Sequence, residues 1–194
     1  MNNLKVFDVH FANYNGQDNL YFDVEINLHE LLKSEPAYQN EMILGEGTHQ
    51  GKLWVKIWDC GIANAIKHVS DPKIYSISAG VLHPGNNHFL GQSLDNKIVT
   101  YEIRPHFKRL KKKTFEGHVN AGNTCGIDCS SDGRFVCSGD ADGKIWFWDF
   151  KTTRNYTTIN AHKGIVSDIK WNPVHPSLVA SSAWDGTIKL WDKK

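Results

Sequence analysis

The sequence lacks several features that would place it in a functional class directly. Its 194 residues contain no apolar run long enough to cross a membrane, and the first ten, MNNLKVFDVH, lack the apolar core of a signal peptide. The 22 basic and 21 acidic residues nearly cancel, so no overall charge points to nucleic acid or membrane. The sequence has no Walker loop, GxGxxG or HExxH motif. We therefore expect no cofactor, no small-molecule substrate and no membrane partner.

Cysteine is also scarce, with four residues in the whole chain. Cys125, Cys129 and Cys137 lack CxxC spacing and lie in strand-like segments. Such a pattern is neither a disulfide framework nor a metal site, so we expect no metal. We expect reduced, packed thiols and an intracellular protein.

A repeated phrase near the C-terminus is the strongest positive signal. SGDADGKIWFWD, Ser138 to Asp149, returns 43 residues later as SSAWDGTIKLWD, Ser181 to Asp192. The closing Trp-Asp pair, or its Tyr-Glu equivalent, recurs at 58–59, 101–102, 148–149 and 191–192, at intervals of 43, 47 and 43. A period of about 40–45 residues ending in Trp-Asp is typical of WD40 propeller blades.

Within each repeat, short β-branched and aromatic runs alternate with turn residues, as antiparallel sheets require. The sequence therefore predicts an all-β fold of three to four antiparallel four-stranded sheets, arranged as an incomplete, open propeller. We expect residues 1–52 to be a divergent segment with one irregular blade and residues 53–194 to be the WD40 repeat domain. A helix is expected at Ile26–Tyr38, and Asn19–Asn27 or the first strand-like run is the candidate to complete the last blade.

Two sets of polar residues recur at matching offsets, and we expect each to form a buried hydrogen-bonded tetrad. In such a tetrad Asp in the tight turn holds the His ring, His reaches the Ser hydroxyl, and Ser meets the indole N–H. A catalytic triad is the alternative, but a nucleophilic site is normally built once and no GxSxG elbow is present. We therefore expect no enzyme activity from the two sets, His118, Ser138, Asp142, Trp148 and His162, Ser181, Asp185, Trp191.

The run HFKRLKKK, His106 to Lys113, admits three interpretations. It could be a solvated edge strand on which lysines deter pairing. It could be a nuclear localisation element. It could also contact RNA phosphate or a partner protein. The candidate contact residues are Lys108, Arg109, Lys111, Lys112 and Lys113.

Several phrases go beyond generic WD40 blades: GQSLDNKI, KKKTFEGHVNAG, SGDADGKIWFWDFKTT and WDGTIKLWD. Through them, residues 55–192 resemble the C-terminal blades of the family of pre-mRNA-processing factor seventeen. The resemblance implies a nuclear, non-enzymatic scaffold of the spliceosome that acts around the second catalytic step, with spliceosomal proteins and snRNP particles as partners. Members of that family carry seven blades behind a long polar N-terminal region, so this chain carries fewer. The alternative is an adaptor subunit of another nuclear or cytosolic complex, such as a ubiquitin ligase.

Overall fold

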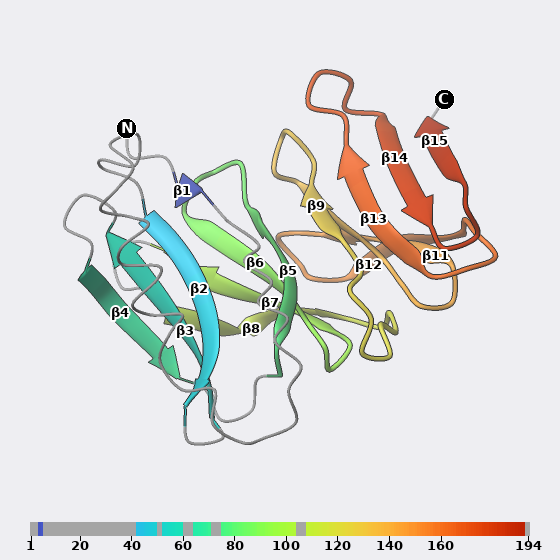
Figure 1. The fold of residues 1–194 in the computed structure, drawn as a ribbon. Coiled ribbons are helices and arrows are strands. Elements are labelled where there is room, and N and C mark those ends of the chain that lie inside the picture. The colour runs from blue at the N-terminus through green and yellow to red at the C-terminus, as the bar shows by residue number, and fades with distance from the viewer. Residues whose placement is uncertain are drawn as a thin grey trace, which may run out of the picture. The chain divides into compact units, whose positions relative to one another are not determined.

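The computed structural model describes four strand segments in the N-terminal part of the chain and, beyond them, residues 75–103 and 108–192. The chain divides into two compact units, Met1–Lys73 and Ile74–Lys194. All regular structure in the described residues is β-strand (Figure 1). None of these residues forms a helix long and apolar enough to span a membrane.

The first unit contains one four-stranded sheet in the order β1-β2-β3-β4. Its strands are β1 (Leu4–Lys5), β2 (Met42–His49), β3 (Lys52–Asp59) and β4 (Asn64–Ser70). Strand β1 is parallel to β2, and the other neighbours are antiparallel. The start of the WD40 repeat domain at residue 53 stays a prediction; this residue lies near the beginning of β3, which pairs with β2. The expected helix at Ile26–Tyr38 and strand at Asn19–Asn27 lie outside the described residues.

The second unit contains three antiparallel sheets that follow one another along the chain. The first comprises β5 (Ile77–Leu82), β6 (His88–Ser93), β7 (Lys97–Glu102) and β8 (Lys108–Glu116). The second comprises β9 (Ile127–Cys129), β10 (Phe135–Gly139), β11 (Lys144–Asp149) and β12 (Asn155–Asn160). The third has three strands, β13 (Val166–Trp171), β14 (Leu178–Ala183) and β15 (Ile188–Asp192). We call these sheets blades A, B and C.

Tight turns join the second and third strands of each blade, and each needs one residue with positive φ. Asn96, Gly143 and Gly186 occupy this position in blades A, B and C, with φ of 66°, 79° and 77°. Glycine and asparagine tolerate this conformation better than other residues. The turn chemistry therefore repeats even where the rest of the phrase has diverged.

Two apolar layers separate the three blades, and strand alternation assigns residues to them. In β10, Val136 belongs to the layer against blade A, while its neighbour Cys137 belongs to the layer against blade C. In β11, Trp148 and Phe147 divide in the same way. Strands β10 and β11 of blade B thus pack against a neighbouring blade on each face, which explains the apolar residues on both of their faces. The outer strand β12 is mostly exposed.

The first strands of successive blades lie next to one another, β5 by β9 and β9 by β13 (Figure 1). This is the blade order of a propeller, and it confirms the all-β WD40 prediction. Blade C departs from the expected four strands: β15 is its outer described strand, and Ile188 and Leu190 on it are 77% and 69% exposed.

Candidate functional site

The predicted polar set of blade C forms one connected hydrogen-bonded chain. His162 Nε2 lies 2.8 Å from Ser181 Oγ, and Trp191 Nε1 donates to the same oxygen at 2.9 Å. On the other side of the ring, His162 Nδ1 lies 3.3 Å from Asp185 Oδ2. The network ties the loop before β13 to β14, β15 and the turn between them.

Asp185 also organises the tight turn itself. Its carboxylate accepts hydrogen bonds from the Thr187 hydroxyl, the Lys163 amide and the Thr187 amide. These bonds hold the pKa of Asp185 well below its usual range. Thr187 Oγ1 in addition lies 3.0 Å from His162 Nδ1. Sequence reasoning missed Thr187, although its place directly after Asp-Gly could have marked it as a turn residue.

The Ser181–His162–Asp185 order is that of a catalytic triad, but its surroundings suit a structural network. Ser181 is only 2% exposed, and its hydroxyl oxygen already accepts the indole N–H of Trp191. The His162 side chain is fully buried. A nucleophile needs an accessible oxygen beside a place for the reacting carbon. Here the hydroxyl is enclosed and occupied.

The corresponding set in blade B does not assemble as the sequence predicts. Asp142 lies on the surface and pairs with Lys144 at 3.3 Å rather than with His118. Trp148 donates its indole N–H to the carbonyl of Glu116 at 3.1 Å and not to Ser138. The reason lies in the turn, where Asp140 takes the capping position that Asp185 holds in blade C.

Asp140 is almost fully buried and accepts three hydrogen bonds. Its carboxylate receives the amides of Asp142 and Lys144 and, at 2.6 Å, the indole N–H of Trp146. Because these bonds satisfy the turn locally, Asp142 is free to face solvent. The two aspartates in DADG were the available signal, and the spacing argument selected the second one.

His118 is instead held from blade A. Gln92 donates its amide N–H to His118 Nε2 at 2.7 Å, and its oxygen accepts the Ser138 hydroxyl at 3.4 Å. All three side chains are at most 1% exposed. The result is a buried link between blades A and B rather than a tetrad within blade B. Gln92 follows Gly91, which stands ten residues before Tyr101, as Ser138 stands ten before Trp148. No sequence offset pointed to Gln92.

Burial lowers the pKa of His118 to about 4, although the charge of Asp95 acts in the opposite direction. The folded state therefore keeps this ring neutral, whereas the unfolded chain binds a proton near the ordinary His value of about 6.5. Between these two values the unfolded state holds more protons, so stability is present above pH 6.5 and is lost as the pH falls.

We expect the unfolding free energy to drop by about 2 kcal/mol between pH 8 and pH 5 through His118 alone. Urea unfolding at a series of pH values measures it. In His118→Gln, which cannot titrate, the pH dependence should be smaller by that amount. Parallel curves for the two proteins would contradict a neutral, buried His118.

The three described cysteines are free and buried. Burial raises the pKa of Cys125 and of Cys129 to about 12, and that of Cys137 also rises. These thiols act as small apolar core groups. Within the described ranges, no group of three or more His, Cys, Asp or Glu is placed to hold a metal ion.

Residues 108–113 of the basic run lie in β8, the outer described strand of blade A, and the first two residues of the run lie outside the described residues. Lys108 pairs with Glu102 at 3.2 Å, while Lys111 and Lys112 are exposed. Lys113 places its Nζ 3.8 Å from the centre of the Phe150 ring in blade B. The run is therefore an outer strand whose last lysine contacts the next blade.

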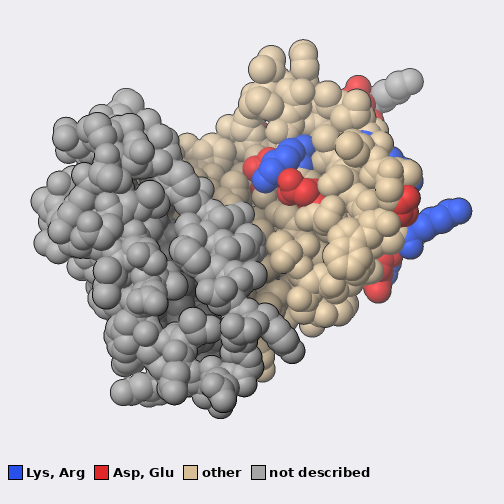
Figure 2. Space-filling model, in the orientation of Figure 1, with Lys and Arg blue, Asp and Glu red and all other residues tan. Residues whose placement is uncertain are grey.

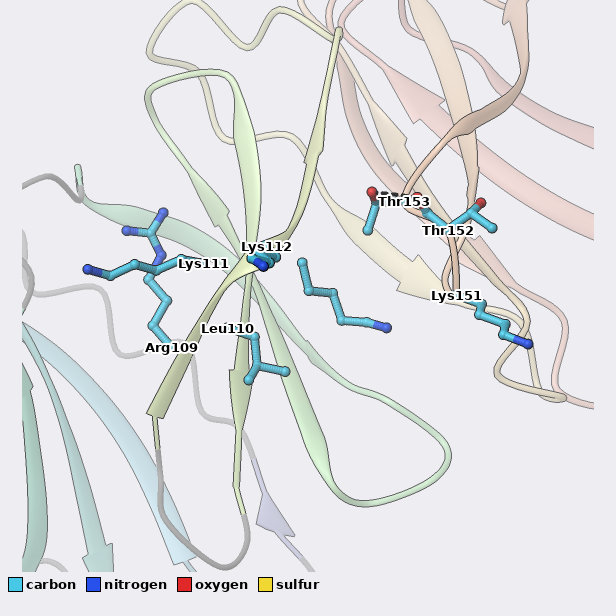
Figure 3. Close-up of a pocket in the computed structure, with 8 residues that line it drawn as sticks. Arg109, Leu110, Lys111, Lys112, Lys151, Thr152 and Thr153 are labelled. Carbon is cyan, nitrogen blue, oxygen red and sulfur yellow. Dashed lines mark hydrogen bonds between the residues drawn. The ribbon is translucent and has the colours of Figure 1, made fainter.

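A hollow of about 540 Å³ lies beside this run, and we call it the β8 groove. It is lined by Arg109, Leu110, Lys111, Lys112 and Lys113 of β8 and by Lys151, Thr152 and Thr153 of the β11–β12 turn (Figure 3). On the face shown in Figure 2, acidic and basic side chains lie next to one another on a largely uncharged surface. The lining of the β8 groove contains Lys and Arg but no Asp or Glu, and Lys151 was not among the candidate contact residues expected from the sequence.

The loop before each blade is tied to that blade's tight turn by the same backbone bond. Leu94 donates to Ser76, Ala141 to Val119 and Trp184 to Ile165, at 2.9, 2.7 and 2.9 Å. At this position in blade C the Trp184 side chain is 68% exposed. Exposed aromatic side chains on rigid turns are typical anchors of protein interfaces.

Comparison with known proteins agrees with this architecture. The family model "WD domain, G-beta repeat" matches residues 110–149 and 153–192. Pre-mRNA-processing factor 17 of Homo sapiens is 38% identical over 138 residues, which are 71% of this chain and 24% of that protein. The Saccharomyces cerevisiae protein of the same name is 37% identical over 140 residues, 71% of this chain and 30% of its own length. The chain therefore spans about a quarter to a third of these relatives.

Two further matches are more distant. WD repeat-containing protein 25 of Mus musculus is 28% identical over 134 residues, 69% of this chain and 25% of that protein. Among solved structures, the computationally designed Ika4 protein superposes with a TM-score of 0.59 at 21% identity, over 77% of this chain and 89% of its own. The second likeness concerns the fold alone.

Proposed function

We propose that this WD40-repeat chain serves as a non-enzymatic protein-interaction module of the pre-mRNA splicing machinery. The observation that carries the proposal is the similarity of 138 residues to Pre-mRNA-processing factor 17, at 38% identity. By this proposal the chain works in the nucleus, around the second catalytic step, with spliceosomal proteins and snRNP particles as its partners.

The site chemistry is compatible with such a role. The Ser and His side chains that could have served catalysis are buried and hydrogen-bonded in blades B and C, whereas Asp142 lies on the surface away from His118. Rigid blades with repeated turns instead present exposed loop residues, which is how repeat proteins commonly bind partners. An adaptor role in another complex would use the same architecture. The two roles are therefore distinguished by which proteins and RNAs associate with the chain.

The test is purification of the tagged full chain from nuclear extract, followed by detection of snRNA and snRNP proteins. We expect both to be enriched over a tagged, unrelated WD40 protein. Recovery of a different complex, such as ubiquitin-ligase subunits, without snRNA would reject the splicing proposal.

A pair of variants addresses the binding face in the same assay. Trp184→Ala changes an exposed residue in the β14–β15 turn, and Val174→Ala changes a residue of the β13–β14 loop that is 75% exposed. We expect the Trp184 variant to lose most of the co-purifying material and the Val174 variant to keep it. The opposite pattern would assign binding to the β13–β14 loop.

A further inference from the structure

We propose that the β8 groove binds an extended acidic segment of a partner protein, which lies along the outer edge of β8. This inference rests on the proposed function only in taking the partner to be a protein. A test with purified protein and peptide can reject the groove as a binding site while the association of the chain with snRNP particles still holds.

The first argument is the charge of the groove. Five of its eight lining residues are cationic and none is acidic. Asp149, the last residue of β11, does not line the groove, although its charge acts on Lys113, and its Oδ1 accepts hydrogen bonds from the amide and hydroxyl of Thr152, both at 2.8 Å. A carboxylate-bearing segment would therefore meet cations from two consecutive blades. Charge-assisted hydrogen bonds to carboxylates are stronger than neutral ones.

The second argument is the geometry of β8. Side chains alternate between the two faces of a strand, yet the consecutive residues 109–113 all line the groove. Figure 3 shows Arg109 and Lys111 extending to one side of β8 and Leu110 to the other. The groove therefore follows the strand's edge rather than one of its faces.

That edge is open in the described part of the chain. Blade A has the order β5-β6-β7-β8, so only β7 pairs with β8 there. An open edge presents unpaired backbone N–H and C=O groups to which an extended peptide can add. Lysines normally discourage such pairing, but an acidic strand reverses the sign of that effect.

The third argument separates a peptide from single-stranded RNA. Binding of single strands without sequence preference usually combines basic residues with aromatic rings on which bases stack. No aromatic residue lines the groove. Phe150, on the adjacent turn, is stacked on His83 with centroids 3.9 Å apart and carries Lys113 Nζ over its ring. The positive charge of the groove and the open edge of β8 favour a peptide, and no residue that lines the groove has an aromatic ring on which a base could stack.

The experiment measures binding of labelled ligands to the full chain by fluorescence anisotropy. The ligand is an alternating Glu-Thr peptide of about ten residues, long enough to cover the nine-residue strand β8. Its controls are the Gln-Thr peptide, a Glu-Thr peptide methylated on alternate backbone amides, and oligouridine of equal charge.

Two protein variants with the same charge change complete the design. Lys111→Glu/Lys112→Glu alters the groove, and Lys163→Glu/Lys170→Glu alters exposed lysines elsewhere. Thermal melting checks that each is folded. If the groove variant does not fold, Lys111→Gln/Lys112→Gln replaces it, with Lys163→Gln/Lys170→Gln as its control.

We expect the Glu-Thr peptide to bind and the Gln-Thr peptide and oligouridine to bind at least about tenfold more weakly. The groove variant should lose at least about tenfold in affinity for the Glu-Thr peptide, and the control variant should lose little. Amide methylation should also weaken binding, because it removes the added-strand hydrogen bonds.

Three results would overturn the proposal. Tighter binding of oligouridine through the same lysines would make the occupant nucleic acid. Equal losses in both lysine variants would show general charge attraction. Absence of any binding by the Glu-Thr peptide would leave β8 as a solvated edge strand.

Discussion

Gly143→Ala is expected to destabilise the fold strongly. Gly143 has a φ of 79°, and a methyl group there would overlap the carbonyl oxygen of His162 and lie 2.9 Å from its carbonyl carbon. These are backbone atoms, held in place because Ala161 and His162 both donate to the Gly143 carbonyl. The loop before blade C would have to move. We expect a loss of more than about 3 kcal/mol in the unfolding free energy.

Gly186→Ala is the matched control, because Gly186 holds the same turn position in blade C. Its φ is 77°, but nothing lies within 4 Å of the added methyl group. Only the backbone conformation opposes the change, which costs about 1–2 kcal/mol. Urea unfolding of the two variants measures the difference. Equal losses would mean that the close approach at Gly143 does not constrain the fold.

Ser181→Ala is expected to have the next largest effect. Its hydroxyl is the shared partner of His162 Nε2 and Trp191 Nε1, so the change leaves two polar groups at the centre of blade C without their partner. Each unsatisfied buried group costs about 1–3 kcal/mol, and together we expect about 2–4 kcal/mol. Ser181→Thr, which keeps a hydroxyl, should recover part of the loss.

Ser138→Ala is the control at the equivalent position of blade B. Its hydroxyl bonds to the adjacent Gly139 carbonyl and, at 3.4 Å, to Gln92, so no indole depends on it. We expect a loss of about 1 kcal/mol. Asp185→Ala should likewise lower the melting temperature more than Asp142→Ala. If the Ser181 and Ser138 variants melt alike, or the Asp185 and Asp142 variants do, the two blades do not differ in their hydrogen-bond networks as described.

The strands of blades B and C follow closely from the amino-acid order. The β-branched and aromatic runs on either side of the Asp-Gly turns are the segments that form β10, β11, β14 and β15. This succeeded because strand periodicity and turn preference are local properties that each segment carries by itself.

Of the two polar networks, the sequence predicted the partners in one and not in the other. The set around His162 repeats a spacing within one blade, and its four side chains meet as the offsets implied. The set around His118 does not, because two aspartates compete for one turn and Gln92 reaches in from another blade. Spacing in sequence cannot rank two acceptors whose separation is only two residues.

What the sequence determined by itself is the blade: the order of its strands, the positive-φ position of its tight turn, and the resemblance to a family of WD40 splicing factors. What only the tertiary structure decided is which polar groups meet between blades. Gln92 and Ser138 are 46 residues apart, and Lys113 and Lys151 line one groove from different blades. Such pairings depend on how one sheet packs against the next, and buried polar groups then take whichever partner that packing brings within reach.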